Sequence, residues 1–178
     1  ASEDKATRDF WADTIQTNFL RAYTNSDIIG VQVGGSVKNI LAIAAGISSG
    51  LGFGANTQAA LITRGLAEMT RLGVALGGES ITFQGLSGMG DLVLTCSDDL
   101  SRNRRFGKEL SNNIPAEQAI KNINATVEGF NALKLVIKIA DKHQIEMPIC
   151  EQVLSVIKGT KTPNEAVTEL LLRKPNQE

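Results

Sequence analysis

Apolar residues recur at helical spacing along most of this chain, and the longest apolar run sets the expected architecture. From Ile28 to Leu51 there is almost no polar face, a pattern typical of a long, nearly buried helix. A second periodic stretch runs from Leu61 to about Leu76 and is ended by two glycines. Shorter periodic stretches predict helices over residues 90–96, 101–111, 115–120, 130–143, 148–158 and from 162 onward. The pattern therefore predicts a mainly α, multi-helix protein.

The two ends of the chain differ from this pattern. Residues 2–16 predict a short amphipathic helix capped by Ser2, and the alternation in Phe19–Thr24 favours a β-strand. A turn follows, with Asp27 as the expected N-cap of the long helix. After Arg173 the sequence is polar, which predicts a frayed end.

Polar residues add detail to two of the predicted helices. Asn56 is the expected N-cap of the helix that ends near residue 76, and residues 162–165 have the spacing of a capping box. Arg64, Glu68 and Arg71 follow each other at spacings of four and three, which favours a solvated ladder of ion pairs.

Composition narrows the class of protein. The chain has 178 residues and a formal net charge of −1, so no overall charge attracts it to nucleic acid or to a membrane surface. Cys96 and Cys150 lack metal-ligand spacing and predict buried free thiols in a reducing compartment. No signal peptide is evident, and the most apolar run, Ile40–Leu51, is short and glycine-rich for a membrane span. We therefore expect a cytoplasmic protein without membrane insertion. The chain opens with Ala1 rather than methionine, as a fragment or processed product would.

The chemically unusual residues gather around Lys38 and the glycine-rich stretch Gly85–Gly107. A lysine within an apolar helix must be paired, neutral or directed into a cleft, because burial of an unpaired ammonium costs several kcal/mol. Asp91 follows three glycines and is expected in the first turn of a helix, where negative charge is favoured. Thr95 lies one helical turn later, so both side chains are expected to reach the same ammonium.

A second helix start, at residues 101–103, has the character of a phosphate site. Ser101, Arg102 and Asn103 supply backbone N–H groups, a hydroxyl and a guanidinium that can face one anion. The neighbouring Arg104 and Arg105 are interpreted as solvated or ion-paired. A nucleic-acid interface is not indicated, because aromatic residues and a basic net charge are lacking.

Each candidate also has a simpler structural interpretation. Lys38 is compatible with a side chain that extends from a helix edge to solvent, Asp91 with a plain helix cap, and Glu128 with stabilisation of a helix start. A non-catalytic helical dimerisation module would place Lys38, Asp91 and Arg102 far apart in space.

Four motifs occur in a fixed order, namely Gly30–Asn39 (GVQVGGSVKN), Gly88–Thr95 (GMGDLVLT), Ser101–Gly107 (SRNRRFG) and Val127–Gly129 (VEG). Together they resemble the C-terminal half of bacterial NAD(P)-dependent glycerol-3-phosphate dehydrogenases. The resemblance extends over nearly the whole chain. The N-terminal half of that family carries a glycine fingerprint for the dinucleotide, and no such fingerprint is present here.

The resemblance implies roles for individual positions. Lys38 corresponds to the catalytic acid/base, Asp91 to an acid that binds substrate and the lysine region, and Thr95 to a site threonine of eukaryotic relatives. The positions implied to hold the substrate and its phosphate are Lys38, Asp91, Ser101, Arg102 and Asn103. The positions implied to contact the nicotinamide cofactor are Arg102, Thr126 and Glu128.

The resemblance also implies an architecture and an activity. Residues 26–178 are expected to form an all-helical bundle of the 6-phosphogluconate dehydrogenase C-terminal-like type, and residues 1–25 to be the remnant of a Rossmann domain. NAD or NADP would be bound mainly by the missing half, with no metal. The parent would interconvert sn-glycerol 3-phosphate and dihydroxyacetone phosphate for glycerophospholipid synthesis, with a homodimer as the family expectation, and this chain alone would be inactive. Dehydrogenation of another hydroxyacid or sugar-acid phosphate remains an alternative.

Overall fold

The structure is a computed structural model that describes residues 1–173. These residues form α1 (Lys5–Ile15), α2 (Ile28–Gly50), α3 (Ala55–Ala75), α4 (Ser80–Gln84), the π-helix η1 (Leu86–Gly90), α5 (Asp91–Ser97), α6 (Arg102–Ser111), α7 (Ala116–Ile123), α8 (Glu128–Lys142), α9 (Pro148–Ile157) and α10 (Pro163–Leu172). The predicted mainly α, multi-helix fold is confirmed. The frayed end predicted after Arg173 lies outside the described residues.

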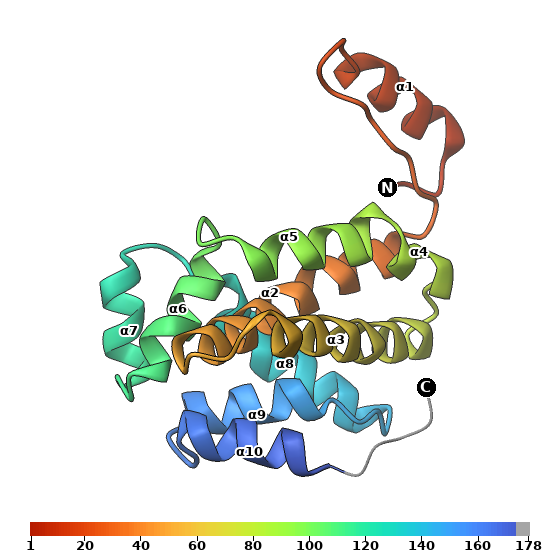
Figure 1. Ribbon diagram of the computed structural model, residues 1–178. Helices are drawn as coiled ribbons and strands as arrows, with labels where there is room; N and C mark the ends of the chain where they lie inside the picture. Colours follow the sequence, from red (N-terminus) through yellow and green to blue (C-terminus); the bar gives the residue numbers. More distant parts are fainter. Residues whose placement is uncertain (174–178) are drawn as a thin grey trace.

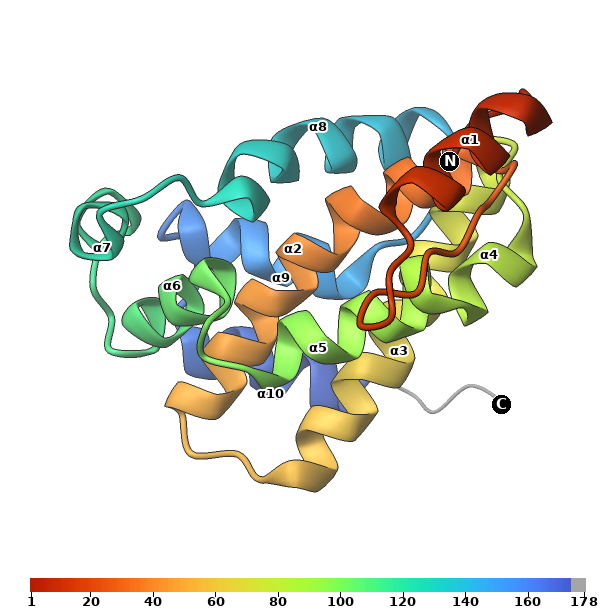
Figure 2. The ribbon, with the colours of Figure 1, turned by 90° about the horizontal axis from the view of Figure 1, so that it is seen from above.

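Helix α2 lies at the centre of the bundle. It packs against α3, α5, α6, α8 and α9, and Figure 2 shows α8 along one side of it and α3 and α5 along the other. All residues from Ile40 to Ser48 are buried. Because neighbours cover α2 on all sides there, the sequence of this segment has no polar face, and the predicted long buried helix is confirmed. Asp27 is its N-cap, as predicted.

The same burial explains why α2 has the composition of a membrane span. Among residues 1–173 it is the one helix whose length and hydropathy would allow it to cross a bilayer. A helix that is apolar all round is found either in lipid or in a protein core. Here five neighbouring helices cover it. The expected lack of membrane insertion stays a prediction.

Helices α2 and α6 cross with their backbones in contact. A Cβ atom on Gly46 would lie 2.0 Å from the carbonyl oxygen of Arg104, and one on Gly107 would lie 2.1 Å from that of Ile43. Only glycine permits so close an approach. The contact brings the first turn of α6 beside the middle of α2.

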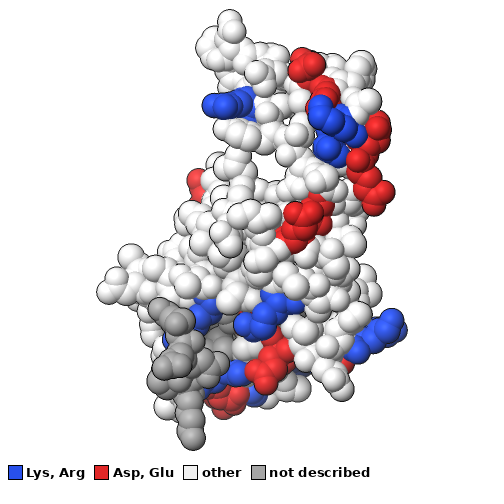
Figure 3. Space-filling view, turned by 90° about the vertical axis from the view of Figure 1, so that its right-hand side faces the viewer, with Lys and Arg blue, Asp and Glu red and all other residues white. Residues whose placement is uncertain are grey.

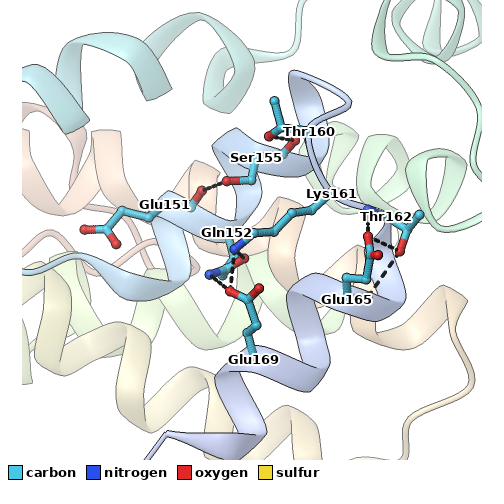
Figure 4. Close-up of polar contacts among 8 residues, drawn as sticks. All are labelled: Glu151, Gln152, Ser155, Thr160, Lys161, Thr162, Glu165 and Glu169. Atoms are coloured by element: carbon cyan, nitrogen blue, oxygen red, sulfur yellow. Dashed lines mark hydrogen bonds and ion pairs between the residues drawn. The ribbon is translucent and has the colours of Figure 1, made fainter.

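Helices α9 and α10 form a hairpin that is joined by polar side chains (Figure 4). Lys161 donates to Gln152 at 3.1 Å and forms an ion pair with Glu169, which also accepts from the Gln152 amide at 3.0 Å. At the start of α10, the backbone N–H of Thr162 donates to Glu165 and that of Glu165 donates to the Thr162 hydroxyl. The predicted capping box is thereby confirmed.

The N-terminal segment, residues 1–26, stands apart from the other helices (Figure 1). Its helix is capped by Asp4, whose carboxylate accepts from the Thr7 N–H at 2.8 Å, so the prediction of Ser2 as cap was wrong. The predicted strand at Phe19–Thr24 is also wrong. A strand requires a backbone partner, and the structure contains no strand in residues 1–173.

This segment exposes a set of large apolar side chains. They are Phe10, Trp11, Ile15, Phe19, Leu20 and Tyr23. Figure 3 shows a large uncharged area between the charged groups of the face on the right-hand side of Figure 1. Six large apolar side chains are thus exposed within residues 10–23.

Several predicted helix ends differ from the structure. Helix α3 begins at Ala55 with Gly54 as its N-cap, and no side chain caps it, so Asn56 is already inside the first turn. Helix α7 continues to Ile123, and α8 begins at Glu128 rather than at Phe130. The acidic Glu128 is well suited to the first turn of α8, because the helix dipole favours negative charge there.

The predicted solvated ion-pair ladder on α3 was wrong at its central residue. Glu68 is 1% exposed, and its carboxylate accepts from the N–H groups of Ile149 at 2.7 Å and Cys150 at 3.4 Å. These N–H groups belong to the first turn of α9, which has no other side-chain cap. Arg71 donates to the Glu146 carbonyl oxygen instead of pairing along α3. Helical spacing does not show which face of a helix another helix covers.

Both cysteines are buried and free, as predicted. Burial raises the pKa of the Cys96 thiol to about 12 and raises that of Cys150 well above its usual value. Because the thiolate is the reactive form, these residues act as small apolar side chains.

Candidate functional site

The side chain of Lys38 leaves the buried helix α2 and forms an ion pair with Asp91 at the start of α5. The two side chains are 20% and 33% exposed, so the pair lies at the edge of the core and can be reached from solvent. A π-helical turn, η1, runs directly into α5 and contacts α2. Single π-helical turns are rare and are frequent at functional sites. Of the three states expected for Lys38, this geometry shows the paired one, and it differs from a lysine extended freely into solvent.

Thr95 lies one turn after Asp91, as the spacing predicts, but its hydroxyl is used differently. It donates to the Asp91 carbonyl oxygen at 2.6 Å and lies 3.2 Å from Asp91 Oδ1. The structure therefore joins Thr95 to the ammonium of Lys38 through Asp91. The direct contact expected from the helical spacing is replaced by a hydrogen bond within α5.

The residue after Lys38 joins the ion pair to α6 and α8. The Asn39 amide donates to the Gly35 carbonyl oxygen at 2.9 Å, which leaves its Oδ1 to accept from the Asn103 amide at 2.9 Å. Asn103 Oδ1 in turn accepts from the Gly129 N–H at 2.8 Å, in the first turn of α8. Both amides are thus fixed in orientation, and α2, α6 and α8 meet beside the lysine.

The remaining candidates lie at the edge of this junction. The Arg102 guanidinium pairs with Glu128 at 2.6 Å, and both side chains are more than 40% exposed. Ser101 is the N-cap of α6, and its hydroxyl accepts from the Arg104 N–H at 3.3 Å. Thr126 is exposed in the connection that precedes α8. Polar contacts therefore link the region of Lys38 and Asp91 to that of Arg102 and Glu128, which differs from the scatter expected of a non-catalytic module.

The two arginines that follow have different environments. Arg104 is 7% exposed and is held by an ion pair with Asp99 and a hydrogen bond to the Ser49 hydroxyl. Arg105 is exposed. Since Arg104 is turned inward, the exposed guanidinium groups of this turn are those of Arg102, which pairs with Glu128, and Arg105.

A metal site and a surface groove are the two other kinds of functional site considered for this protein. No group of three or more His, Cys, Asp or Glu side chains within the described chain is arranged to hold a metal ion. A shallow groove of about 690 Å³ follows α3 and is lined by residues such as Leu66, Thr70 and Val74. None of the predicted site residues lines this groove. The candidate site is instead an open edge, bounded by groups from α2, α5, α6 and α8.

Comparison with known proteins identifies the family of this chain and the part of that family's members that it matches. The family model described as "NAD-dependent glycerol-3-phosphate dehydrogenase C-terminus" matches residues 27–168. The chain belongs to this family. The matched range begins at Asp27, the N-cap of α2, and includes every candidate residue of the site. It leaves out α1 and the segment that follows it.

Individual glycerol-3-phosphate dehydrogenases agree with this assignment. The chain is 65% identical over all of its 178 residues to "Glycerol-3-phosphate dehydrogenase [NAD(P)+]" of Ruthia magnifica subsp. Calyptogena magnifica, of which it covers 55%. It is 54% identical over 174 residues to the enzyme of that name from Hydrogenovibrio crunogenus, covering 97% of this chain and 51% of the relative. The chain therefore spans about half the length of the curated relatives it matches.

Solved structures of the family have the same fold. The glycerol-3-phosphate dehydrogenase of Coxiella burnetii superposes with a TM-score of 0.92 at 46% identity, over 96% of this chain and 52% of that one. The glycerol-3-phosphate dehydrogenase of Plasmodium falciparum, at 20% identity, shares the fold with a TM-score of 0.84 over 99% of this chain and 51% of that one. The all-helical C-terminal domain of these enzymes is thus the architecture of residues in α2 to α10.

One member of the junction was missed by the site prediction. Asn39 is a polar residue on an apolar helix, but it was not among the predicted site residues. Its partners are Asn103, 64 residues later, and the backbone of its own helix. The hydropathy pattern shows that Asn39 is unusual, but its pairing with Asn103 depends on how α6 crosses α2.

Proposed function

We propose that this chain is the substrate-binding and catalytic half of a cytoplasmic NAD(P)-dependent glycerol-3-phosphate dehydrogenase. The complete enzyme interconverts sn-glycerol 3-phosphate and dihydroxyacetone phosphate for glycerophospholipid synthesis. The observation that carries the proposal is the Lys38–Asp91 ion pair, joined through Asn39 and Asn103 to the helix start that bears Arg102. This arrangement supports a reaction that needs a proton donor and an anion-binding group in one region.

Lys38 is suited to move the proton on the reacting oxygen. Reduction of a ketone to a secondary alcohol requires a proton at the former carbonyl oxygen. The ammonium of Lys38 supplies that proton from Nζ, and it polarises the carbonyl group before transfer. Asp91 holds the ammonium in position and is itself held by the Thr95 hydroxyl.

The substrate phosphate is proposed to bind at the start of α6. This helix has ten residues, and its first N–H groups carry the positive end of the helix dipole. The exposed guanidinium of Arg102 can bind a phosphate with two parallel hydrogen bonds. The side-chain oxygens of Asn103 and Ser101 already accept hydrogen bonds from backbone N–H groups. Each side chain still has a hydrogen that it can donate to the substrate or to a water.

The cofactor fits the outer edge of this region. Arg102, Thr126 and Glu128 expose a guanidinium, a hydroxyl and a carboxylate to solvent, a set that suits the phosphate and ribose groups of a dinucleotide. When bound, NAD or NADP supplies the hydride. Most of its binding groups are expected in the half of the enzyme that this chain does not include. The homodimer and the absence of a metal are further expectations for the complete enzyme.

Dehydrogenation of a different hydroxyacid or sugar-acid phosphate would use the same lysine and arginine. The two functions differ in which carbon skeleton is accepted. A substrate panel on the full-length enzyme separates them, and preference for a substrate other than dihydroxyacetone phosphate would favour the second.

The decisive test is Lys38→Ala in the full-length enzyme, assayed by NAD(P)H oxidation with dihydroxyacetone phosphate. We expect kcat to fall on the order of 10²–10⁴-fold, the usual contribution of a general acid, with an unchanged circular dichroism spectrum. Lys134→Ala, at an exposed position on α8, is the matched control and should retain full activity. Near-normal turnover of the Lys38 variant would remove this residue from the chemistry.

A further inference from the structure

The carboxylate of Asp27 joins the starts of two helical segments. Its Oδ1 accepts from the Gly30 N–H at 2.7 Å in the first turn of α2, and its Oδ2 accepts from the Glu79 N–H at 2.8 Å at the start of α4. Asp27 is 8% exposed. Burial alone would raise its pKa, but hydrogen bonds from Gly30, Glu79 and Thr82 together lower it, so the carboxylate is charged when it holds both segments. An N-cap needs only the first of these contacts.

The backbones at this point are in direct contact. A Cβ atom on Gly30 would lie 2.1 Å from Asp27 Oδ2, and one on Gly78 would lie 3.1 Å from both N and Cα of Gly30. The Asn25 amide donates to the Thr82 hydroxyl at 3.4 Å and adds a further link between the chain before α2 and α4. Little relative movement of the two segments is possible here without loss of hydrogen bonds.

Both segments lead from this point to the candidate catalytic pair. Lys38 lies eleven residues after Asp27 on α2, and Asp91 lies twelve residues after Glu79, beyond α4 and η1. Between these ends the segments touch again, because a Cβ atom on Gly34 would lie 2.7 Å from the Ser87 carbonyl oxygen of η1. The two segments are therefore joined at three places: at the Asp27 carboxylate, at the contact of Gly34 with Ser87, and at the Lys38–Asp91 ion pair.

We propose that Asp27 is a positioning residue for the Lys38–Asp91 pair. By fixing the start of α4 to the start of α2, it sets where Asp91 meets the ammonium of Lys38. It also stands directly after the N-terminal segment, so the same carboxylate fixes the pair relative to the junction with the rest of the enzyme. This inference rests on the proposed function, because the reaction assigns the pair its role.

Asp27→Ser in the full-length enzyme separates the two contacts. Serine is a good N-cap and keeps the bond to Gly30, but its side chain is too short to reach Glu79. We expect kcat for dihydroxyacetone phosphate to fall about 10–100-fold, as a misplacement of about 1 Å can cause, with KM changed by less than about threefold. Asp4→Ser, at the exposed N-cap of α1, is the matched control and should leave kcat unchanged. Asp27→Asn, which keeps the shape and one acceptor, replaces the serine variant if that one does not fold.

A double-mutant cycle with Asp91→Asn tests whether Asp27 acts through the pair. Residues coupled through one arrangement show non-additive effects. Asp27→Ser should therefore lower kcat in the unsubstituted enzyme but by less than about twofold in the Asp91→Asn background. Equal losses in both backgrounds, or no loss in either, would overturn the proposal.

Two readouts do not depend on turnover. Hydrogen exchange should become faster at the Glu79 amide and stay slow at the Gly30 amide, and a crystal structure of the variant should show Lys38 Nζ and Asp91 separated. If Glu79 exchange is unchanged or the ion pair is intact, Asp27 does not position it. If the unsubstituted enzyme does not reduce dihydroxyacetone phosphate, the proposed function fails, while these two measurements still decide the role of Asp27.

Discussion

At the scale of single residues, the environment of a side chain decides its chemistry more than its type does. Asp27, Glu68 and Asp91 are all acids that contact helix N-termini or a cation, and each is buried to a different degree. Burial raises the pKa of Glu68 to about 7, although the N–H groups of Ile149 and Cys150 and the charge of Arg71 oppose the rise. Glu68 has no part in the proposed reaction, so its titration reports on the fold.

Stability is predicted to fall with rising pH because of Glu68. The pKa of Glu68 is raised from 4.5 to about 7 on folding. Between these values the folded state binds more protons than the unfolded state. The contribution of Glu68 to the free energy of unfolding is therefore full below about pH 4.5 and is lost as pH rises through about 7. Urea unfolding should show that the free energy of unfolding declines by on the order of 2–3 kcal/mol between pH 5 and pH 8 because of this group.

Glu68→Gln removes the titrating group while keeping one acceptor for the first turn of α9. The pH slope should then disappear from this interval. Glu117→Gln, at an exposed position on α7, is the control and should leave the slope unchanged. If the dependence of the unfolding free energy on pH persists in the Glu68 variant, other groups cause it.

Arg102→Ala is predicted to weaken phosphate substrates selectively. Its guanidinium is an exposed positive charge at the first residue of α6, and losing one partner of a charge-assisted contact costs about 2–5 kcal/mol. For dihydroxyacetone phosphate, kcat/KM should fall at least about 30-fold, whereas for dihydroxyacetone it should change little. Arg105→Ala, on the same helix and exposed, serves as control. Equal losses for both substrates would mean that Arg102 does not bind the phosphate.

At the scale of elements, close backbone contacts hold the site together. Helix α2 meets η1 at Gly34 and α6 at Gly46, and the first turn of α8 is held by Asn103. The ion pair and the amide pair lie between these contacts. The distances between helices, and with them the geometry of the site, therefore depend on residues that carry no functional group.

Adjacent glycines on α2 give a matched test of this idea. A Cβ atom on Gly34 would lie 2.7 Å from the Ser87 carbonyl oxygen, whereas one on Gly35 would meet nothing within 4 Å. Gly34→Ala should destabilise the protein by about 1–3 kcal/mol through overpacking. Gly35→Ala should stabilise it by about 0.5–1 kcal/mol, because alanine is the better helix former. Urea unfolding measures both, and stabilisation by Gly34→Ala would contradict the close α2–η1 contact.

At the scale of the whole molecule, the described residues form a helical bundle and an N-terminal segment that the bundle does not cover. Helix α1 stands apart from the bundle (Figure 1), and the segment exposes Phe10, Trp11, Phe19 and Tyr23. The relatives are nearly twice as long as the chain. We propose that residues 1–25 are the remnant of a Rossmann domain, as the sequence predicts, and that the rest of that domain covers these side chains.

The chain alone is predicted not to oxidise NAD(P)H with dihydroxyacetone phosphate, because most groups that bind the cofactor are expected in the other half. The amides of α1 should exchange rapidly in the chain and slowly in the full-length enzyme, while those of α8 should be similar in both. Measurable turnover by the chain, or equal exchange of α1 in both proteins, would contradict this view.

The sequence by itself determined the helical class, the long apolar helix, the capping box at residues 162–165 and the set of candidate residues. These follow from periodicity and local polar patterns, which act over a few neighbouring residues. Only the tertiary structure decided that Glu68 is buried, that Asn39 pairs with Asn103 and that Asp27 reaches Glu79. It also replaced the predicted strand at Phe19–Thr24 with exposed irregular chain. These features depend on contacts between distant segments, because burial and pairing are properties of how helices cross and not of the residues along one helix.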